Sequence, residues 1–342
     1  MPRFAGPYGG ERHMLHYAST LGEWGHEVVI YTHMFSPDCR QLIFSNNVRL
    51  IETGFPRVKS HYLQVLFSHL FVLNLAARVR GEFDLIQVWG GEGVLAGALL
   101  RRFRRKYAGV SMLLVTGEPP RFAYDLEEES LAGKNMLWKL VLRMGVPVVR
   151  YLDKISVRQM DMVVVNNDWV SEQFQDIYAR ECRIIYPGVE TERFKRYSKD
   201  EARNILGLNR DLKIFLSVSK LHPRKRIDDA IRVYGEYSAK LESTVFFIIG
   251  DGPEENALKE LAQRLGMNDV IFLGRLSDEQ VAIYNQAADY FIFTAKNEPY
   301  GIAPMEAKVA GCQLLPEDKL NPIISWEESA EQIFKLYKDI LA

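Results

Sequence analysis

The 342-residue sequence contains little cysteine, and its three cysteines stand far apart. Cys39, Cys182 and Cys312 form no CxxC pair and lack nearby histidines at metal-ligand spacing, so we expect reduced thiols rather than disulfides. The seven histidines are scattered along the chain. The sequence therefore predicts no bound metal.

Charge of one sign and long apolar runs are lacking too. Lysine and arginine number 43 against 44 acidic residues, so the net charge of −1 gives no overall field for nucleic acid. No stretch approaches the ~20 apolar residues of a membrane span, and we expect no signal peptide before Gly6. These absences indicate a cytoplasmic protein, or one attached to the inner face of a membrane.

Strands and helices alternate regularly in the second half of the chain. Expected strands are Ile214–Val218, Val245–Ile249, Val270–Leu273 and Tyr290–Thr294; expected helices are Ile227–Leu241, Glu254–Leu265 and one from the capping box of Ser277 and Gln280 to Ala288. This alternation predicts an α/β fold with a parallel sheet covered by helices. The loops after the strands should meet at one edge of that sheet.

The first half shows the same pattern less regularly. A helix is expected over Glu11–Trp24, with strands at Val28–Tyr31, Leu85–Val88, Met112–Val115, Met162–Asn166 and Arg183–Tyr186. The chain length favours two domains, and Tyr186-Pro187-Gly188 is the predicted hinge. We thus expect an acceptor-side domain over 1–187, a donor domain over 188–325, and a closing helix within 326–342 that can pack back on either domain.

The segment Asn297 to Gly311 reads Asn-Glu-Pro-Tyr-Gly-Ile-Ala-Pro-Met-Glu-Ala-Lys-Val-Ala-Gly and follows an expected buried strand. A tight loop should feed a short helix that begins near Gly301 and ends at Gly311. Free N–H groups and partial positive charge at a helix N-terminus suit phosphate. Glu298 and Glu306 would repel phosphate but accept hydrogen bonds from sugar or ribose hydroxyls. Phosphate and polyol together indicate a nucleotide sugar.

Four cations crowd the loop after the first strand of the second half: Lys220, Arg224, Lys225 and Arg226. At the carboxyl edge of a parallel sheet, such cations can neutralise a diphosphate and stabilise the charge on a leaving nucleotide. A solvated basic loop is the plainer interpretation. We favour the diphosphate because the Glu298 loop shares this edge.

Two glycine-rich stretches could let a ligand approach the backbone closely. Gly250-Asp251-Gly252 joins a strand to a helix, and Gly6 to Arg12 opens the first expected helix. A tight turn in the first case and a flexible chain end in the second are the alternative interpretations.

Two segments suggest a surface for anionic lipid. Arg101 to Tyr107 reads Arg-Arg-Phe-Arg-Arg-Lys-Tyr, and Met136 to Tyr151 mixes apolar side chains with Lys139, Arg143 and Arg150. The first segment could equally be a solvated helix end, where basic residues are favoured. Both interpretations stay open.

Several motifs together resemble the retaining glycosyltransferases of family 4, over nearly the whole chain. Glu298 to Gly311 resembles the E-x7-E signature, Ser219 to Lys225 the Gly-Arg-Leu…Lys-Gly loop, Tyr186 to Glu190 with Arg193-Phe194 the interdomain stretch, and Gly9 to His13 with Gly25 to Val28 the N-terminal segment. The resemblance implies the GT-B fold, in which two Rossmann-like parallel-sheet domains face a central cleft. Pro119 to Asp125 looks like the subgroup that includes mannosyltransferases of surface-polysaccharide synthesis.

The resemblance also implies roles for individual residues. Lys220 and Lys225 would contact the donor diphosphate and Glu298 the transferred sugar, as the catalytic set. The donor-binding positions would be Gly10, Gly250, Gly252, Arg275, Tyr300, Gly301, Ile302 and, for the ribose, Glu306. Glu118 and Arg121 would lie on the acceptor side. The family retains the anomeric configuration and needs neither a metal nor another cofactor.

Three positions depart from the family pattern. Gly117 stands where the subgroup has a histidine that is expected to face the donor sugar. No clear apolar strand precedes Gly9, so the first strand is expected to be missing. After Gly311 the chain passes quickly through Gln313-Leu314-Leu315 to the last helix, where the family has a glycine-rich loop and another strand, so this region is expected to be shortened.

The sequence thus predicts an enzyme that moves a sugar, with mannose a candidate, from a GDP- or UDP-linked donor to a glycan or polyprenyl-linked acceptor. Because Gly117 replaces the expected histidine, a non-catalytic nucleotide-sugar-binding homologue is an alternative. A sugar-nucleotide epimerase with the same fold is another. Nucleic acid is not an expected partner.

Overall fold

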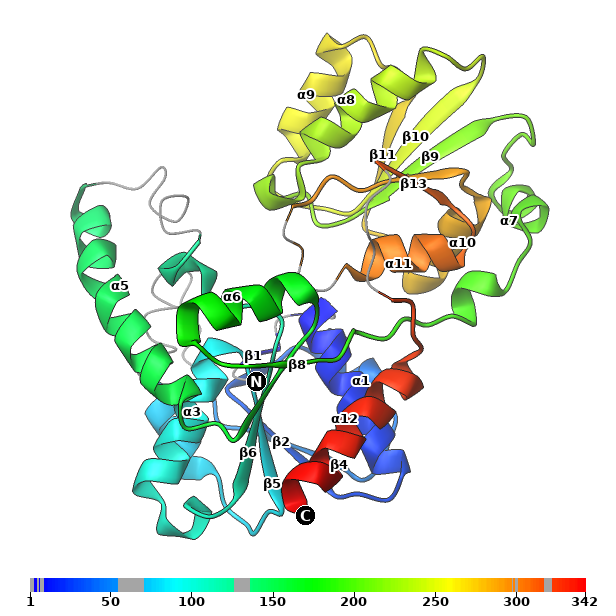
Figure 1. Cartoon of the computed structure of the whole chain (residues 1–342). Helices are drawn as coiled ribbons and strands as arrows, with labels where there is room; N and C mark the ends of the chain where they lie inside the picture. The colour runs from blue at the N-terminus through cyan, green and yellow to red at the C-terminus, as the bar shows by residue number, and fades with distance from the viewer. Residues whose placement is uncertain are drawn as a thin grey trace. The chain divides into compact units, whose positions relative to one another are not determined.

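The computed structural model describes residues 3–4, 6, 9–54, 71–125, 136–296, 298, 301–316 and 322–342. The chain divides into two compact units (Figure 1). Unit 1 comprises Met1–Pro187 and Trp326–Ala342, and unit 2 comprises Gly188–Ser325. The helix expected near the C-terminus therefore belongs to unit 1.

Unit 1 is built on parallel strand pairs. Its largest sheet has the order β5-β6-β7-β8, and two further pairs are β1-β3 and β2-β4. The bounds are β1 Arg3–Phe4, β2 Val28–Thr32, β3 Met34–Phe35, β4 Val48–Glu52, β5 Leu85–Trp89, β6 Ser111–Thr116, β7 Met162–Val165 and β8 Arg183–Ile184. All of the pairings are parallel, as the alternation of strands and helices predicts.

Helices cover both faces of the four-stranded sheet of unit 1. The α-helices are α1 Gly9–Glu23, α3 Gly90–Phe103, α5 Met136–Val157, α6 Asp168–Tyr178 and α12 Trp326–Leu341; the 3-10 turns are η1 Pro37–Leu42, η2 Arg105–Tyr107 and η3 Arg121–Ala123. Successive residues of β6 enter different cores: Leu113 packs in the cluster that contains α1 and α12, and Leu114 in the cluster that contains α6. The two-residue period of a strand explains this division.

The last helix packs on the first one within unit 1. His16 of α1 stacks on Trp326 of α12, with ring centroids 4.5 Å apart and planes inclined by 4°. The Ser329 hydroxyl donates to the Tyr186 carbonyl at 2.6 Å, so the Tyr17 hydroxyl is the donor in its 2.5 Å bond to Ser329. These contacts fix the start of α12 beside the end of β8.

Unit 2 contains a single five-stranded parallel sheet of order β11-β10-β9-β12-β13. Its strands are β9 Lys213–Val218, β10 Thr244–Ile249, β11 Val270–Gly274, β12 Tyr290–Ile292 and β13 Gln313–Leu315. Its helices are α7 Lys199–Leu206, α8 Ile227–Ser238, α9 Glu255–Arg264, α10 Asp278–Ala287 and α11 Ile302–Val309, with 3-10 turns η4 Arg193–Lys195 and η5 Pro223–Lys225. The predicted capping box of Ser277 and Gln280 starts α10 and makes both of its hydrogen bonds.

Two short strands that the sequence analysis did not predict are present, and β1 is the first strand that it expected to be missing. β1 pairs with β3 and buries Phe4, whose ring lies 5.0 Å from that of Phe35. β13 pairs with β12, and Leu315 is buried. Strands of two or three residues are too short to show alternation in the sequence, and their neighbours in the sheet define them.

Candidate functional site

The sheet of unit 2 reverses its direction of growth between β9 and β12. From β9 the chain moves outward through β10 and β11, then crosses to β12 and β13 on the other side of β9. Helix α8, which follows β9, packs in the core on one face, while Ala307 of α11, which follows β12, packs in the core on the other. In open parallel α/β sheets the two post-strand loops diverge at such a switch point, and ligands generally bind there.

Two predicted catalytic residues meet at this switch point. Lys225 ends η5 after β9, Glu298 lies in the loop after β12, and the Lys225 Nζ forms an ion pair with Glu298 Oε2. The side chains are 27% and 19% exposed, respectively, so water screens this pair less than it would a surface pair. The structure thus joins a cation and a carboxylate that are 73 positions apart in the chain.

A side chain of one of these loops also bonds the backbone of the other. The Thr294 hydroxyl donates to the Arg226 carbonyl at 2.7 Å. Arg226 itself has a left-handed backbone, with φ of 51°, and caps α8. A non-glycine residue rarely adopts this conformation, and strain of this kind clusters at functional sites. The sequence analysis did not name Thr294. The left-handed backbone of Arg226 could have been predicted from the family motif, in which a glycine follows the lysine.

The two glycines of the Gly250-Asp251-Gly252 turn are required by packing. A Cβ on Gly250 would lie 1.8 Å from the Ser219 carbonyl oxygen, and one on Gly252 would lie 2.1 Å from the Leu221 carbonyl oxygen. The Leu221 N–H donates to the Asp251 carbonyl at 2.8 Å. The turn therefore supports the loop that carries Lys220, and contact of these glycines with a donor stays a prediction.

The electrostatic environment of the β9 loop is positive. Burial lowers the pKa of His222, and the nearby charges of Arg224, Lys220 and Lys225 lower it further. The imidazole is therefore neutral at pH 7, since even the unperturbed pKa of histidine is near 6.5. Such a loop favours an anionic ligand.

Helix α11 begins where the sequence predicts. Gly301 is its N-cap, with a left-handed φ of 57°, and the helix runs from Ile302 to Val309. Glu306 is half-buried on it, between the buried Met305 and Ala307. Tyr300 lies outside the described residues. Arg275 follows β11, two strands away from β9, so it shares the edge but lies farther from the switch point.

The two predicted acceptor-side residues form a local brace in unit 1. The Arg121 guanidinium, 8% exposed, binds Asp125 at 2.6 Å and Glu118 at 3.5 Å. It also lies over the Trp169 ring, 5.5 Å from the centroid. Burial lowers the pKa of Arg121, but the bonds to Asp125 and Glu118 outweigh it and raise the pKa overall. An acceptor phosphate would have to displace Asp125.

The remaining unit 1 positions lie where strands end or helices begin. Gly10 lies in the first turn of α1 and is half-buried. Gly117 is buried directly after β6, where the Thr116 hydroxyl donates to the Glu118 carbonyl at 2.9 Å. Both glycines belong to unit 1, and their donor and acceptor roles stay predictions.

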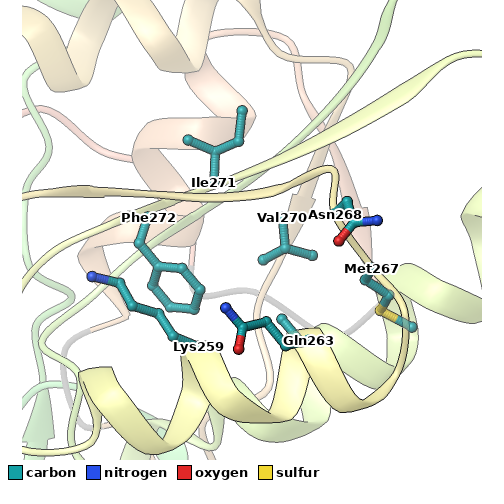
Figure 2. Close-up of a pocket in the computed structure, with 8 residues that line it drawn as sticks. Lys259, Gln263, Met267, Asn268, Val270, Ile271 and Phe272 are labelled. Atoms are coloured by element: carbon teal, nitrogen blue, oxygen red, sulfur yellow. The ribbon is translucent and has the colours of Figure 1, made fainter.

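A hollow of about 350 Å³ lies elsewhere in unit 2, between α9 and the outer strand β11 (Figure 2). Lys259 and Gln263 of α9 line it from one side and Phe272 of β11 from the other. It is two strands from β9 and was not predicted to be functional. Among the described residues, no three histidine, cysteine or acidic side chains gather as a metal site.

Two relatives show which proteins this chain is similar to in sequence. The chain is 29% identical over 187 residues to the alpha-monoglucosyldiacylglycerol synthase of Streptococcus pneumoniae, a match that covers 52% of this chain and 42% of that protein. It is 25% identical to the GDP-mannose-dependent alpha-(1-6)-phosphatidylinositol monomannoside mannosyltransferase of Mycolicibacterium smegmatis, over 75% of this chain and 64% of that one. The chain thus spans less than two thirds of the length of these relatives.

The fold is the GT-B fold that the resemblance implies. Anabaena Alr3699/HepE, solved in complex with UDP and glucose, superposes with a TM-score of 0.65 at 18% identity, over 98% of this chain and 88% of that one. A sequence profile for glycosyl transferases group 1 matches residues 198–318. The profile for Glycosyltransferase Family 4 matches residues 7–193, more than half of the chain, and the protein therefore belongs to glycosyltransferase family 4.

Proposed function

We propose that this protein is a retaining hexosyltransferase that uses a nucleotide-sugar donor. The observation that carries the proposal is the ion pair of Lys225 and Glu298 at the switch point of unit 2. In this pair, a cation that would neutralise the diphosphate lies beside a carboxylate that would accept hydrogen bonds from the sugar. The two loops that carry them are also joined by the hydrogen bond from the Thr294 side chain to the Arg226 carbonyl.

The ion pair also suggests how the donor is recognised. A diphosphate offers Lys225 a stronger anionic partner than one carboxylate, and it would free Glu298 to accept hydrogen bonds from sugar hydroxyls. Lys220 would add a second positive charge, and the first turn of α11 would offer N–H groups and the positive end of its dipole. Glu306 would bind the ribose hydroxyls.

The same groups would serve the chemistry. In transfer with retention, the bond from the anomeric carbon to the phosphate oxygen breaks, and a bond to the acceptor oxygen forms on the same face. The acceptor hydroxyl proton passes to the leaving phosphate oxygen. Fixed cations at the diphosphate stabilise the negative charge that develops there, so the reaction needs no metal.

For the donor and acceptor we propose a UDP- or GDP-hexose and a lipid-linked or surface glycan, met at the cytoplasmic face of a membrane. The name of the Streptococcus relative refers to a diacylglycerol product and that of the Mycolicibacterium relative to GDP-mannose and phosphatidylinositol. The HepE structure contains UDP and glucose. These names favour a hexose donor and a lipid acceptor without choosing the base or the sugar.

The test begins with a thermal-shift screen of GDP- and UDP-hexoses, because a ligand at 100 times its Kd stabilises a protein by about 2.7 kcal/mol. Lys225→Ala and Glu298→Ala are then compared with Lys240→Ala, which removes an exposed lysine of the same unit. We expect Lys225→Ala to weaken UDP binding by about 10- to 150-fold in calorimetry, and both site variants to lose sugar transfer. Unchanged turnover in both would reject the site.

Gly117 supports a second candidate, a nucleotide-sugar-binding protein without transferase activity, since it replaces the histidine of the subgroup. Donor binding with no transfer to several lipid and glycan acceptors would favour this candidate. Recovery of an isomerised nucleotide sugar would instead indicate an epimerase. Both outcomes are read from the same product analysis by mass spectrometry.

A further inference from the structure

The clearest unassigned surface of the protein is one side of α5 in unit 1. Among the side chains of this helix that the structure describes, six apolar ones are exposed, from 36% at Ile155 to 85% at Met136. We call this set the α5 stripe: Met136, Leu140, Met144, Val148, Tyr151 and Ile155. They recur every three or four positions, so they form one continuous row along a helix of 22 residues, about 33 Å long.

The opposite side of α5 is buried in unit 1. Val146, Ser156 and Val157 are buried there, and α5 packs along α3. Asp153, the one acidic residue of the helix, is buried too and accepts hydrogen bonds from the hydroxyls of Tyr124, at 2.8 Å, and Tyr178, at 2.5 Å. The exposed side of α5 therefore carries no negative charge.

A row of positive charges runs beside the stripe. Lys139, Arg143, Arg150 and Lys154 each stand one position before a stripe residue. One position is about 100° of rotation on a helix, so all four lie on the same flank of the stripe. Arg150 also donates to the Ala123 carbonyl, which anchors that flank on unit 1.

The other basic segment, Arg101 to Tyr107, is used inside unit 1. Arg101 binds Asp161 at 2.8 Å and the Val110 carbonyl at 2.8 Å, and Arg104 donates to the Ala77 carbonyl at 3.2 Å. Lys106 donates to the Gly81 carbonyl at 3.0 Å. Three of the five cations of this segment, those of Arg101, Arg104 and Lys106, are therefore bonded within unit 1.

We infer that the α5 stripe is the docking surface for an anionic lipid bilayer. An exposed apolar row flanked by cations, on a helix whose other side is packed, matches a helix that lies in the plane of the interface. The stripe enters the acyl boundary and the flanking cations meet phosphate headgroups. A second copy of the chain would bring the same positive flank against the stripe, and α5 offers no exposed carboxylate to pair with it. The inference extends the proposed function, because it names the surface at which a lipid-linked acceptor is met.

The test is co-sedimentation of the full chain with vesicles, in the absence of any nucleotide sugar. Vesicles of phosphatidylcholine alone are compared with vesicles that also contain phosphatidylglycerol. Wild-type protein should sediment with the second kind, and less so in high salt, which screens the headgroup charge. The double variant Leu140→Glu and Met144→Glu should lower the partition coefficient at least about tenfold, because it places charge in the apolar row.

Matched variants separate the stripe from other surfaces. Lys139→Gln with Lys154→Gln should weaken binding by about fivefold per charge, whereas Arg102→Gln with Arg105→Gln, two exposed positions of the other basic segment, should leave it unchanged. Ile205→Glu with Leu265→Glu adds the same charges to exposed apolar positions of unit 2 and should also have no effect. Circular dichroism confirms that each variant is folded.

Absence of wild-type binding to anionic vesicles would overturn the inference, and so would an equal loss in the Arg102/Arg105 variant. A dimer in lipid-free solution that the Leu140/Met144 variant abolishes would instead identify a second copy as the occupant. UDP affinity, measured on the same variants, should stay at the wild-type value. The UDP affinity therefore distinguishes failure of the docking surface from failure of the proposed function.

Discussion

The carboxyl edges of the sheets in units 1 and 2 use their charged side chains differently. In unit 1, Arg121 pairs with residues three and four positions away, within one loop. In unit 2, Lys225 pairs with Glu298, which belongs to a different loop. A pair within one loop holds that loop in shape, whereas a pair across a switch point can open to admit a ligand without unfolding either loop.

The comparison also concerns the backbone. In unit 2, the turn at Gly250 lies against the loop of Ser219 so closely that no Cβ fits. That contact fixes the loop that presents Lys220 and Lys225. The proposed function needs this combination, in which close packing holds the base of the loop and a diphosphate would replace Glu298 as the partner of Lys225.

The largest effect should come from Gly250→Ala. Its Cβ would overlap the Ser219 carbonyl oxygen, and its φ of 135° is unfavourable for alanine, so we expect a loss of about 3 kcal/mol or more in the free energy of unfolding. Gly266→Ala is the matched control, since its φ is 70° but its Cβ meets nothing within 4 Å. Urea denaturation of both variants checks the difference, and equal losses would mean that the close packing is not what requires glycine.

Removal of Arg121 from unit 1 and removal of Lys225 from unit 2 should affect stability and UDP affinity differently. Arg121→Ala leaves two partly buried carboxylates without their partner, so it should lower stability by about 2–3 kcal/mol and leave UDP affinity unchanged. Lys225→Ala should weaken UDP binding and cost less stability, about 1–2 kcal/mol, because it leaves one half-buried carboxylate, that of Glu298, without its partner. Denaturation and calorimetry on both proteins are sufficient. If Arg121→Ala also removed UDP binding, the division of roles would be wrong.

Acid should destabilise unit 1 through His13. Burial, with a smaller effect of His16, lowers the pKa of His13 to about 3. The unfolded chain therefore binds a proton to His13 more readily than the folded chain does. The stability that neutral His13 contributes to the folded state is complete above about pH 6.5 and is lost as the pH falls towards 3. The slope should approach about 1.4 kcal/mol per pH unit. His13→Phe should flatten the curve of unfolding free energy against pH. His222→Asn is the comparison variant in unit 2. An unchanged slope in His13→Phe would mean that His13 is not the source of the acid sensitivity.

The smallest effects should come from two residues with left-handed backbones, one in each unit. Ala179 ends α6 with φ of 50°, and Arg226 begins α8 with φ of 51°. Glycine relieves the strain, so Ala179→Gly should stabilise by about 1 kcal/mol. Arg226→Gly should gain less, because it also loses the ion pair with Asp229. Only Arg226→Gly should alter UDP affinity. If Ala179→Gly changed UDP affinity by the same amount, the left-handed backbone at Arg226 would have no special relation to the site.

Much of the fold was visible in the sequence because long strands and helices carry their own periodic signal. The expected strand Val245–Ile249 differs from β10 by one residue, and the helix Trp326 to Leu341 has the predicted bounds. β1 and β13 escaped prediction because two or three residues give no period, and only a neighbouring strand makes them strands. At the site, the residue types were predictable from the sequence. The hydrogen bond of Thr294 to the Arg226 carbonyl was not, because a local pattern does not indicate a partner 68 positions away.

The sequence alone determined the family, through the spacing of Glu298 and Glu306 and the lysines of the β9 loop, because motif spacing is a property of the chain itself. It determined the parallel α/β architecture for the same reason. The tertiary structure decided which charges meet: Lys225 reaches Glu298, while Arg121 and the basic run at Arg101 are paired within unit 1. It also decided which side of α5 faces outward. Pairing and exposure depend on what else packs against a residue, and a linear pattern does not contain that information.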